Sequence, residues 1–165
     1  MEYLLTKHNV TTTPIDVEKI IESEGIRIRH TKTSHDVFGA AIIKDGVRLI
    51  TVKEMDCPQR QRFTLAHELG HMMLHAEQAI NIDHKEIKFL RDIDSSRGTE
   101  WREVEANFFA ASILMPSRFV HQFIEMHHGS SNSLSCLDIE TMAEEFKVSV
   151  SAMTIRLSNL GFETW

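Results

Sequence analysis

The sequence has 165 residues, of which 42% are hydrophobic and 25% are charged, a composition typical of one soluble globular domain. The net charge of −6 disfavours non-specific binding to nucleic acid phosphates, and no apolar run is long enough to span a bilayer. The N-terminal residues show no signal-peptide pattern, and the two cysteines match no metal-binding spacing. We therefore expect a cytoplasmic protein that does not associate with membranes.

The first predicted element is a helix that begins near residue 13. Thr13 is a suitable N-cap, and Pro14 fits the first helical position because no backbone N–H is needed there. Gly25 is a typical residue after a helix end. The expected core face of this helix carries Val17, Ile20 and Ile21.

A small sheet is predicted next. Residues 26–29 alternate between apolar and basic side chains, as in a short strand. Two further strand-like runs, 38–43 and 47–52, flank a Lys-Asp-Gly sequence. Because an Asp-Gly pair tolerates positive φ angles, these two runs predict a β-hairpin.

The rest of the sequence predicts helices, apart from residues 79–99, whose weak periodicity allows no assignment. The expected helices cover 58–75, 100–114, 117–126, 139–146 and 150–159. One helix, a small antiparallel sheet and then several helices indicate an α+β fold. We expect residues 1–132 to form the main domain and residues 133–165 to form a helical extension packed on it.

The strongest chemical signal is an H-E-x-x-H motif from His67 to His71 on the predicted helix 58–75. Residues four apart lie on one helical face, so both imidazoles can reach the same ion while Glu68 projects beside them. Zinc accepts such ligands, and the carboxylate of Glu68 would act as the catalytic base. The alternative is that both histidines are hydrogen-bonded residues without a metal.

A third protein ligand is needed, and the next helix offers several glutamates. Helical phase places Glu105 on the face that also carries Trp101, Phe108, Phe109 and Ser112. The opposite, polar side carries Glu100, Glu103 and Asn107. We therefore expect Glu105 to point to the core and to bind the metal. The alternative for Glu105 is an ion pair with Arg102.

Two segments, Arg62 to His75 and Glu105 to Pro116, together resemble the ImmA/IrrE family of metallo-endopeptidases. The resemblance implies a zincin-like helical core with one zinc ion bound by His67, His71 and Glu105, and with Glu68 as the catalytic residue. Manganese or cobalt would be alternatives to zinc. The family further implies a protein substrate, typically a DNA-binding repressor encoded by a mobile element or stress locus.

The C-terminal residues 141–161 have helix-turn-helix spacing, with Ser149 as the expected cap of the second helix. Their expected core is Ala143, Phe146, Val148, Ala152 and Leu157. Because the candidate recognition helix carries one arginine and no lysine, direct binding to nucleic acid is not favoured.

The leading hypothesis is therefore a zinc-dependent endopeptidase that cleaves a specific intracellular regulator. One alternative is a non-catalytic, zinc-dependent protein that sequesters such a regulator. A second alternative is a helix-turn-helix DNA-binding regulator. Glu68 argues for the enzyme, because a structural metal site needs no general base.

Overall fold

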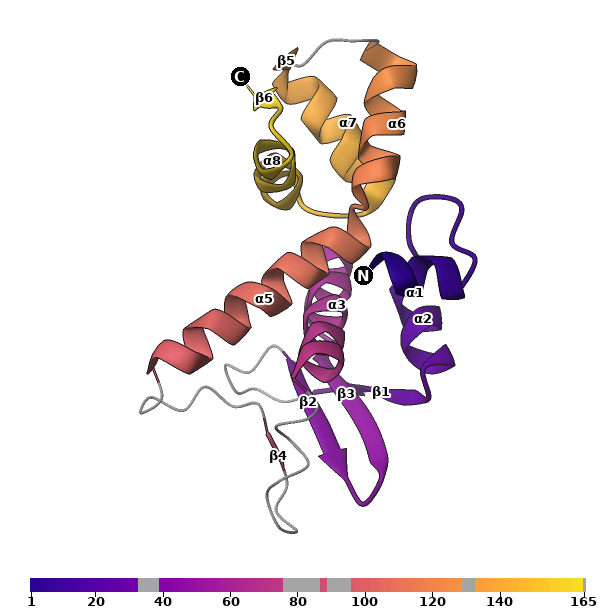
Figure 1. Cartoon of the computed structure of the whole chain (residues 1–165), viewed down its shortest axis with the longest axis vertical. Coiled ribbons are helices and arrows are strands. Elements are labelled where there is room, and N and C mark those ends of the chain that lie inside the picture. The colour runs from indigo at the N-terminus through magenta and orange to yellow at the C-terminus, as the bar shows by residue number, and fades with distance from the viewer. Residues whose placement is uncertain (33–38, 76–86, 89–95, 129–132, 165) are drawn as a thin grey trace. The chain divides into compact units, whose positions relative to one another are not determined.

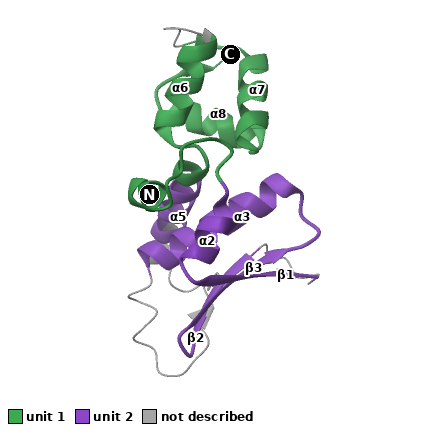
Figure 2. Cartoon of the chain, turned by 90° about the vertical axis from the view of Figure 1, so that its right-hand side faces the viewer, with its two compact units in different colours: residues 1–15, 111–165 green, residues 16–110 purple. Residues whose placement is uncertain are grey.

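The computed structural model describes residues 1–32, 39–75, 87–88, 96–128 and 133–164 (Figure 1). They form two compact units (Figure 2). The sheet unit comprises Asp16–Ala110, and the helical unit comprises Met1–Ile15 together with Ala111–Trp165. These units do not follow the expected boundary after residue 132, and that division into domains stays a prediction.

The sheet unit contains a four-stranded sheet in the order β1-β3-β2-β4. Asp45 and Gly46, with φ angles of 49° and 76°, turn the chain between β2 and β3, which confirms the hairpin. Strand β1 pairs with β3 in parallel, so the sheet is mixed rather than purely antiparallel. The strands are β1 (Ile26–Thr31), β2 (Gly39–Lys44), β3 (Val47–Lys53) and β4 (Ile87–Lys88).

Helix α2 (Val17–Ser23) confirms the first predicted helix but begins later than expected. Asp16, not Thr13, is its N-cap, and the Asp16 side chain accepts a hydrogen bond of 3.0 Å from the Lys19 backbone N–H. Pro14 precedes the helix and follows a cis peptide bond. The predicted core face is correct, since Val17, Ile20 and Ile21 are all buried.

Two longer helices complete the sheet unit and position its polar residues. Helix α3 (Pro58–Leu74) packs against β2 and β3, and helix α5 (Ser96–Leu114) belongs to this unit as far as Ala110. The two helices approach closely at Gly70. A Cβ atom built there would lie 3.1 Å from Phe109 Cδ1 and 3.3 Å from Ala106 Cα.

Replacing Gly70 by Ala is expected to destabilise the sheet unit. The added methyl group must push α3 and α5 apart, and overpacking of this kind typically costs about 1–3 kcal/mol. Chemical unfolding of the metal-free protein would measure the change. An unfolding free energy equal to that of the wild type would contradict the close helix contact at Gly70.

The helical unit confirms the predicted C-terminal helix pair. Ser149 caps the second helix as expected, because its side chain accepts a hydrogen bond from the Ala152 backbone N–H. Of the expected core residues, Ala152 is half-buried and the other four are buried. The elements of this unit are α1 (Glu2–Lys7), α6 (Ser117–His128), β5 (Ser133–Leu134), α7 (Cys136–Phe146), α8 (Val150–Asn159) and β6 (Glu163–Thr164).

Arg156, the single basic residue of α8, is buried in the helical unit. Its Nε donates a hydrogen bond of 2.9 Å to the backbone oxygen of Met115, just after the end of α5. Two large apolar side chains of the same helix, Val150 and Ile155, are exposed instead. The outer face of α8 therefore offers no cation for a DNA phosphate.

The α+β class predicted from the sequence is confirmed, with helices in the majority and a small sheet. Within the described part of the chain, no helix combines the length and the hydrophobicity needed to cross a membrane. Residues 79–86 and 89–95, which the sequence left unassigned, lie outside the described residues, as does the predicted strand start at Phe38.

Candidate metal centre

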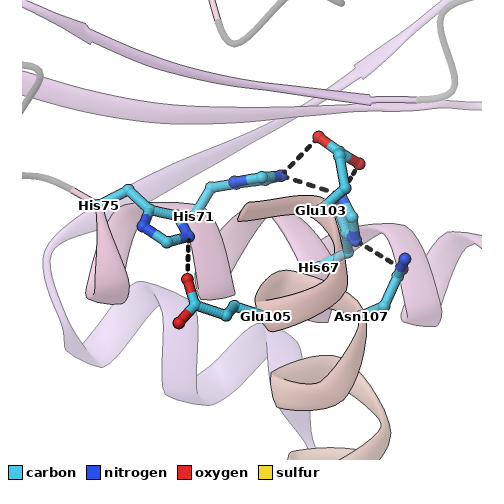
Figure 3. Close-up of polar contacts among 6 residues, drawn as sticks. All are labelled: His67, His71, His75, Glu103, Glu105 and Asn107. Atoms are coloured by element: carbon cyan, nitrogen blue, oxygen red, sulfur yellow. Dashed lines mark hydrogen bonds and ion pairs between the residues drawn. The ribbon is translucent and has the colours of Figure 1, made fainter. Parts of the chain in front are cut away.

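Helix α3 brings its two motif histidines together on one face (Figure 3). The Nε2 atoms of His67 and His71 lie 3.0 Å apart, and the two rings meet edge to face. The side chain of His71 is buried, whereas 16% of the His67 side chain is exposed. The spacing of four residues thus produces the convergence predicted from the motif.

The carboxylate that joins this pair belongs to Glu103 of α5 (Figure 3). Glu103 Oε2 lies 3.4 Å from His67 Nε2, and Glu103 Oε1 lies 3.3 Å from His71 Nε2. The two imidazoles, mainly through hydrogen bonds, hold the pKa of the Glu103 carboxyl far below its usual range. Glu103 is therefore an anion facing two potential metal ligands.

The position predicted for Glu105 is corrected by the structure. Its carboxylate points to His75, with Oε2 at 3.7 Å from His75 Nε2, and does not join His67 and His71 (Figure 3). The buried face of α5 agrees only in part with the predicted one. Phe109 and Ser112 are buried as expected, but Trp101 and Phe108 are 66% and 62% exposed, and Ala106 is fully buried.

The three converging side chains fit a tetrahedral zinc ion. Zinc binds imidazole nitrogens and carboxylate oxygens at about 2.0–2.2 Å, so two ligand atoms of a tetrahedral ion lie roughly 3.3–3.6 Å apart. The three distances among the nearest atoms of His67, His71 and Glu103 are 3.0, 3.3 and 3.4 Å. The donor set is also that of a catalytic site, which keeps one position for water or substrate.

Asn107 of α5 is a further polar residue of the site, one helical turn after Glu103. Its Oδ1 lies 3.0 Å from His67 Nδ1, the ring nitrogen that does not face Glu103. An acceptor at Nδ1 fixes the tautomer in which Nε2 is free to bind a metal. The sequence placed Glu103 and Asn107 on one face through their spacing, but assigned that face to solvent.

Glu68 follows His67 on α3, and its side chain is buried. Burial raises the pKa of the Glu68 carboxyl, against the opposing effects of His67, His71 and the backbone N–H of Ala41. A carboxylate with a raised pKa is a better proton acceptor near neutral pH. Glu68 thus has the environment expected of a general base.

Zinc affinity is expected to fall as the pH is lowered. Burial lowers the pKa of His67, but the hydrogen bond with Glu103 and the charges of Glu68 and Glu103 outweigh this, so the net pKa is raised above 6.5. A protonated imidazole must lose its proton before it binds a metal. Each pH unit below that pKa should therefore weaken binding about tenfold for this one proton.

The metal-free protein should show the opposite trend. Because the pKa of His67 is raised on folding, the protonated ring contributes stability that is complete below the unfolded-state pKa and lost as the pH rises through the folded-state pKa. Zinc titrations against a competing chelator and unfolding of the metal-free protein at several pH values would measure both. A zinc affinity that is constant between about pH 5 and pH 8 would contradict this prediction.

The chain also matches a known protein family. Residues 21–158 match the family Peptidase M78, described as the IrrE N-terminal-like domain. The chain belongs to this family. The IrrE N-terminal-like match contains both α3 and the described part of α5 that carries Glu103 and Asn107.

One curated protein with a similar sequence is the radiation response metalloprotease IrrE of Deinococcus radiodurans. It is 28% identical over 110 residues, which cover 67% of this chain but 30% of the relative. A solved structure, a Mycobacterium tuberculosis transcriptional regulator, matches with a TM-score of 0.63 and 21% identity over 95% of this chain and 44% of that chain. This second likeness shows the fold alone.

Proposed function

We propose that the protein is a zinc-dependent endopeptidase in which His67, His71 and Glu103 bind the metal and Glu68 is the catalytic base. The observation that carries the proposal is the convergence of two imidazole nitrogens and one carboxylate within 4.8 Å, beside a buried glutamate. Membership of a metallopeptidase family supports the same reaction. Manganese or cobalt would suit the same ligands, and metal availability decides among them.

The chain's own residues account for the movement of protons. When bound, zinc would lower the pKa of a water molecule and polarise a peptide carbonyl. Glu68 accepts the proton of the attacking water, as its raised pKa favours, and then delivers that proton to the leaving amine. Asn107 orients the ring of His67 throughout, and Glu103 compensates the charge of the metal.

The substrate is proposed to be an extended segment of a protein that lies along strand β2. In the described residues, β4 pairs with β2 at Ile42 and Ile43, leaving the Gly39–Ala41 part of that edge without a described neighbouring strand. A peptide added there would run past Glu68, because Ala41 contacts its carboxylate. Backbone pairing would hold the peptide, and side-chain contacts would select it.

The proposed substrate is a regulator in the cytoplasm, such as a DNA-binding repressor of a mobile element or stress locus. The Deinococcus relative is a metalloprotease of the radiation response, which supports regulated proteolysis for this chain. Direct action on DNA is not proposed, because the one arginine of α8 is buried. The net charge of −6 instead favours a basic protein partner.

The proposal is tested with purified protein and two probes, the product of the adjacent reading frame and a library of proteome-derived peptides. Zinc-loaded protein should produce new peptide termini, detected by mass spectrometry. Treatment with a chelator should abolish cleavage, and added zinc should restore it. If the loaded protein cleaves neither probe, or cleaves equally after chelation, the proposed function is wrong.

A further inference from the structure

The first residue of strand β2, Gly39, has no room for a side chain. It pairs with Val52 of β3 and faces helix α3. A Cβ atom built on Gly39 would overlap Thr64 Cγ2 and would lie 3.0 Å from the backbone oxygen of Thr51. Real Cβ atoms do not approach a methyl carbon so closely, so any other residue would require the buried Thr64 side chain or the packing of β2 on α3 to shift.

This close approach occurs beside the proposed catalytic base. Thr64 precedes Glu68 by one helical turn, and both side chains are buried. The Cβ built on Gly39 would also lie 3.3 Å from Glu68 Oε1. The Glu68 carboxylate thus packs against strand β2.

The same strand also supplies a donor to that carboxylate. Ala41 lies two residues after Gly39, on the same face of β2, and it is fully buried. Its backbone N–H hydrogen-bonds to the Glu68 carboxylate. Any movement of β2 away from α3 would lengthen this hydrogen bond. The close packing at Gly39 therefore sets the distance between the Ala41 N–H and the Glu68 carboxylate.

One oxygen of Glu68 has no hydrogen-bond partner in the described part of the chain. Oε2 is buried and makes no hydrogen bond to any described residue. A buried, unpaired carboxylate oxygen is costly and is rare unless it serves a function. The strand therefore holds the carboxylate from one side and leaves its other oxygen available to a proton.

We propose that Gly39 is a positioning residue for catalysis, because its missing side chain lets strand β2 lie close enough to α3 to fix the carboxylate of Glu68. The inference rests on the proposed peptidase function. The atoms nearest to a Cβ built on Gly39 belong to Thr64, Thr51 and Glu68, and none of these residues is a proposed metal ligand. Its replacement should therefore change turnover without changing the zinc content.

The test compares Gly39→Ala, Thr64→Ser and the double variant with the wild type. Thr64→Ser removes the methyl group that the new Cβ would strike and keeps the hydroxyl group. Gly39→Ala should bind one zinc ion, while kcat falls by about tenfold or more, since small misplacements of catalytic groups can cost about a hundredfold. The double variant should recover most of this loss.

Gly46→Ala is the matched control. Gly46 lies in the hairpin turn at a φ angle of 76°, and a Cβ atom there would meet nothing within 4 Å. This replacement should destabilise the protein through backbone strain and leave kcat unchanged. If kcat falls in Gly39→Ala but not in Gly46→Ala, the loss results from displacement of Glu68 and not from lower stability of the protein.

Three measurements keep the inference separate from the proposed function. Metal analysis measures the zinc content. The unfolding free energies of the single and double variants show whether Gly39→Ala and Thr64→Ser are coupled, as the steric contact requires. Cleavage of a peptide that the wild type cleaves measures turnover. An active wild type with an equally active Gly39→Ala would overturn the inference alone. Loss of zinc in Gly39→Ala would overturn it too, whereas an inactive wild type would overturn the peptidase function itself.

If Gly39→Ala does not fold, the comparison moves to the Thr64→Ser background, where the closest steric conflict is absent. The added Cβ would still lie 3.3 Å from Glu68 Oε1. The kcat of the double variant should then be about threefold below that of Thr64→Ser. Equal kcat values for these two proteins would overturn the inference.

Discussion

Replacing Glu103 by Gln is expected to lower zinc affinity by more than a hundredfold. The amide keeps the shape of the side chain but loses the negative charge that faces both imidazoles at 3.3 and 3.4 Å. Removal of residues that only orient a metal ligand typically costs about 10–100-fold, and a direct ligand should cost more. Competition with a chromophoric chelator would measure the zinc affinity, and cleavage assays would show a matching loss of activity.

Glu105→Gln is the matched control for this change, because it makes the same substitution two residues away on the same helix. Glu105 faces His75 and not the histidine pair, so its replacement should change zinc affinity by less than about fivefold. If Glu105→Gln abolished zinc binding and Glu103→Gln did not, the ligand set drawn from the structure would be wrong. The original phase argument would then be correct.

Replacing Glu68 by Gln is expected to lower kcat by about 10²–10⁴-fold, the usual contribution of a general base. The protein should still bind one zinc ion, because Glu68 is not among the three converging ligands. Metal analysis and cleavage of a peptide substrate would measure both quantities on the same preparation.

The same variant distinguishes catalysis from sequestration. A protein that only captures a regulator would act equally well with Gln at position 68, and no substrate fragment would appear. Wild-type activity in zinc-loaded Glu68→Gln would therefore exclude the proposed base. Loss of cleavage together with loss of zinc would instead point to a structural role for Glu68.

The elements with strong local signals were predictable from the sequence. The Asp-Gly turn fixed the hairpin, and Pro58 at the start of α3 fixed the N-terminus of the helix that carries the H-E-x-x-H motif. Ser149 likewise marked the start of α8. In each case the turn or cap depends on a few adjacent residues, so no distant contact is needed to recognise it.

The third converging ligand was not predictable from hydrophobic pattern alone. Close packing of α3 and α5 at Gly70 uses small side chains, and Ala106 and Ala110 form the buried face. Three large apolar residues of α5, Trp101, Val104 and Phe108, are exposed. Phe109 is buried, so the large apolar residues do not mark one buried side of α5, whereas the small residues Ala106 and Ala110 do.

Long-range pairings were also beyond the sequence. The parallel alignment of β1 with β3 and the pairing of β5 with β6 join segments that are far apart in the chain. Their registers depend on the packing of the whole unit and carry no local turn signal. The cap of α2 shows the same limit on a smaller scale, since Asp16 and Thr13 are both chemically suitable.

Helix α5 runs without interruption from the residues that face the two imidazoles into the core of the helical unit, where Ile113 and Leu114 are fully buried. Helix formation is cooperative, so a metal ion bound by Glu103 near the middle of α5 would stabilise the helix against unwinding along its length. Metal loading would then protect Ile113 and Leu114 as well as the hydrolytic centre. In a cell depleted of zinc, the protein would lose rigidity in a region that does not contact the ion.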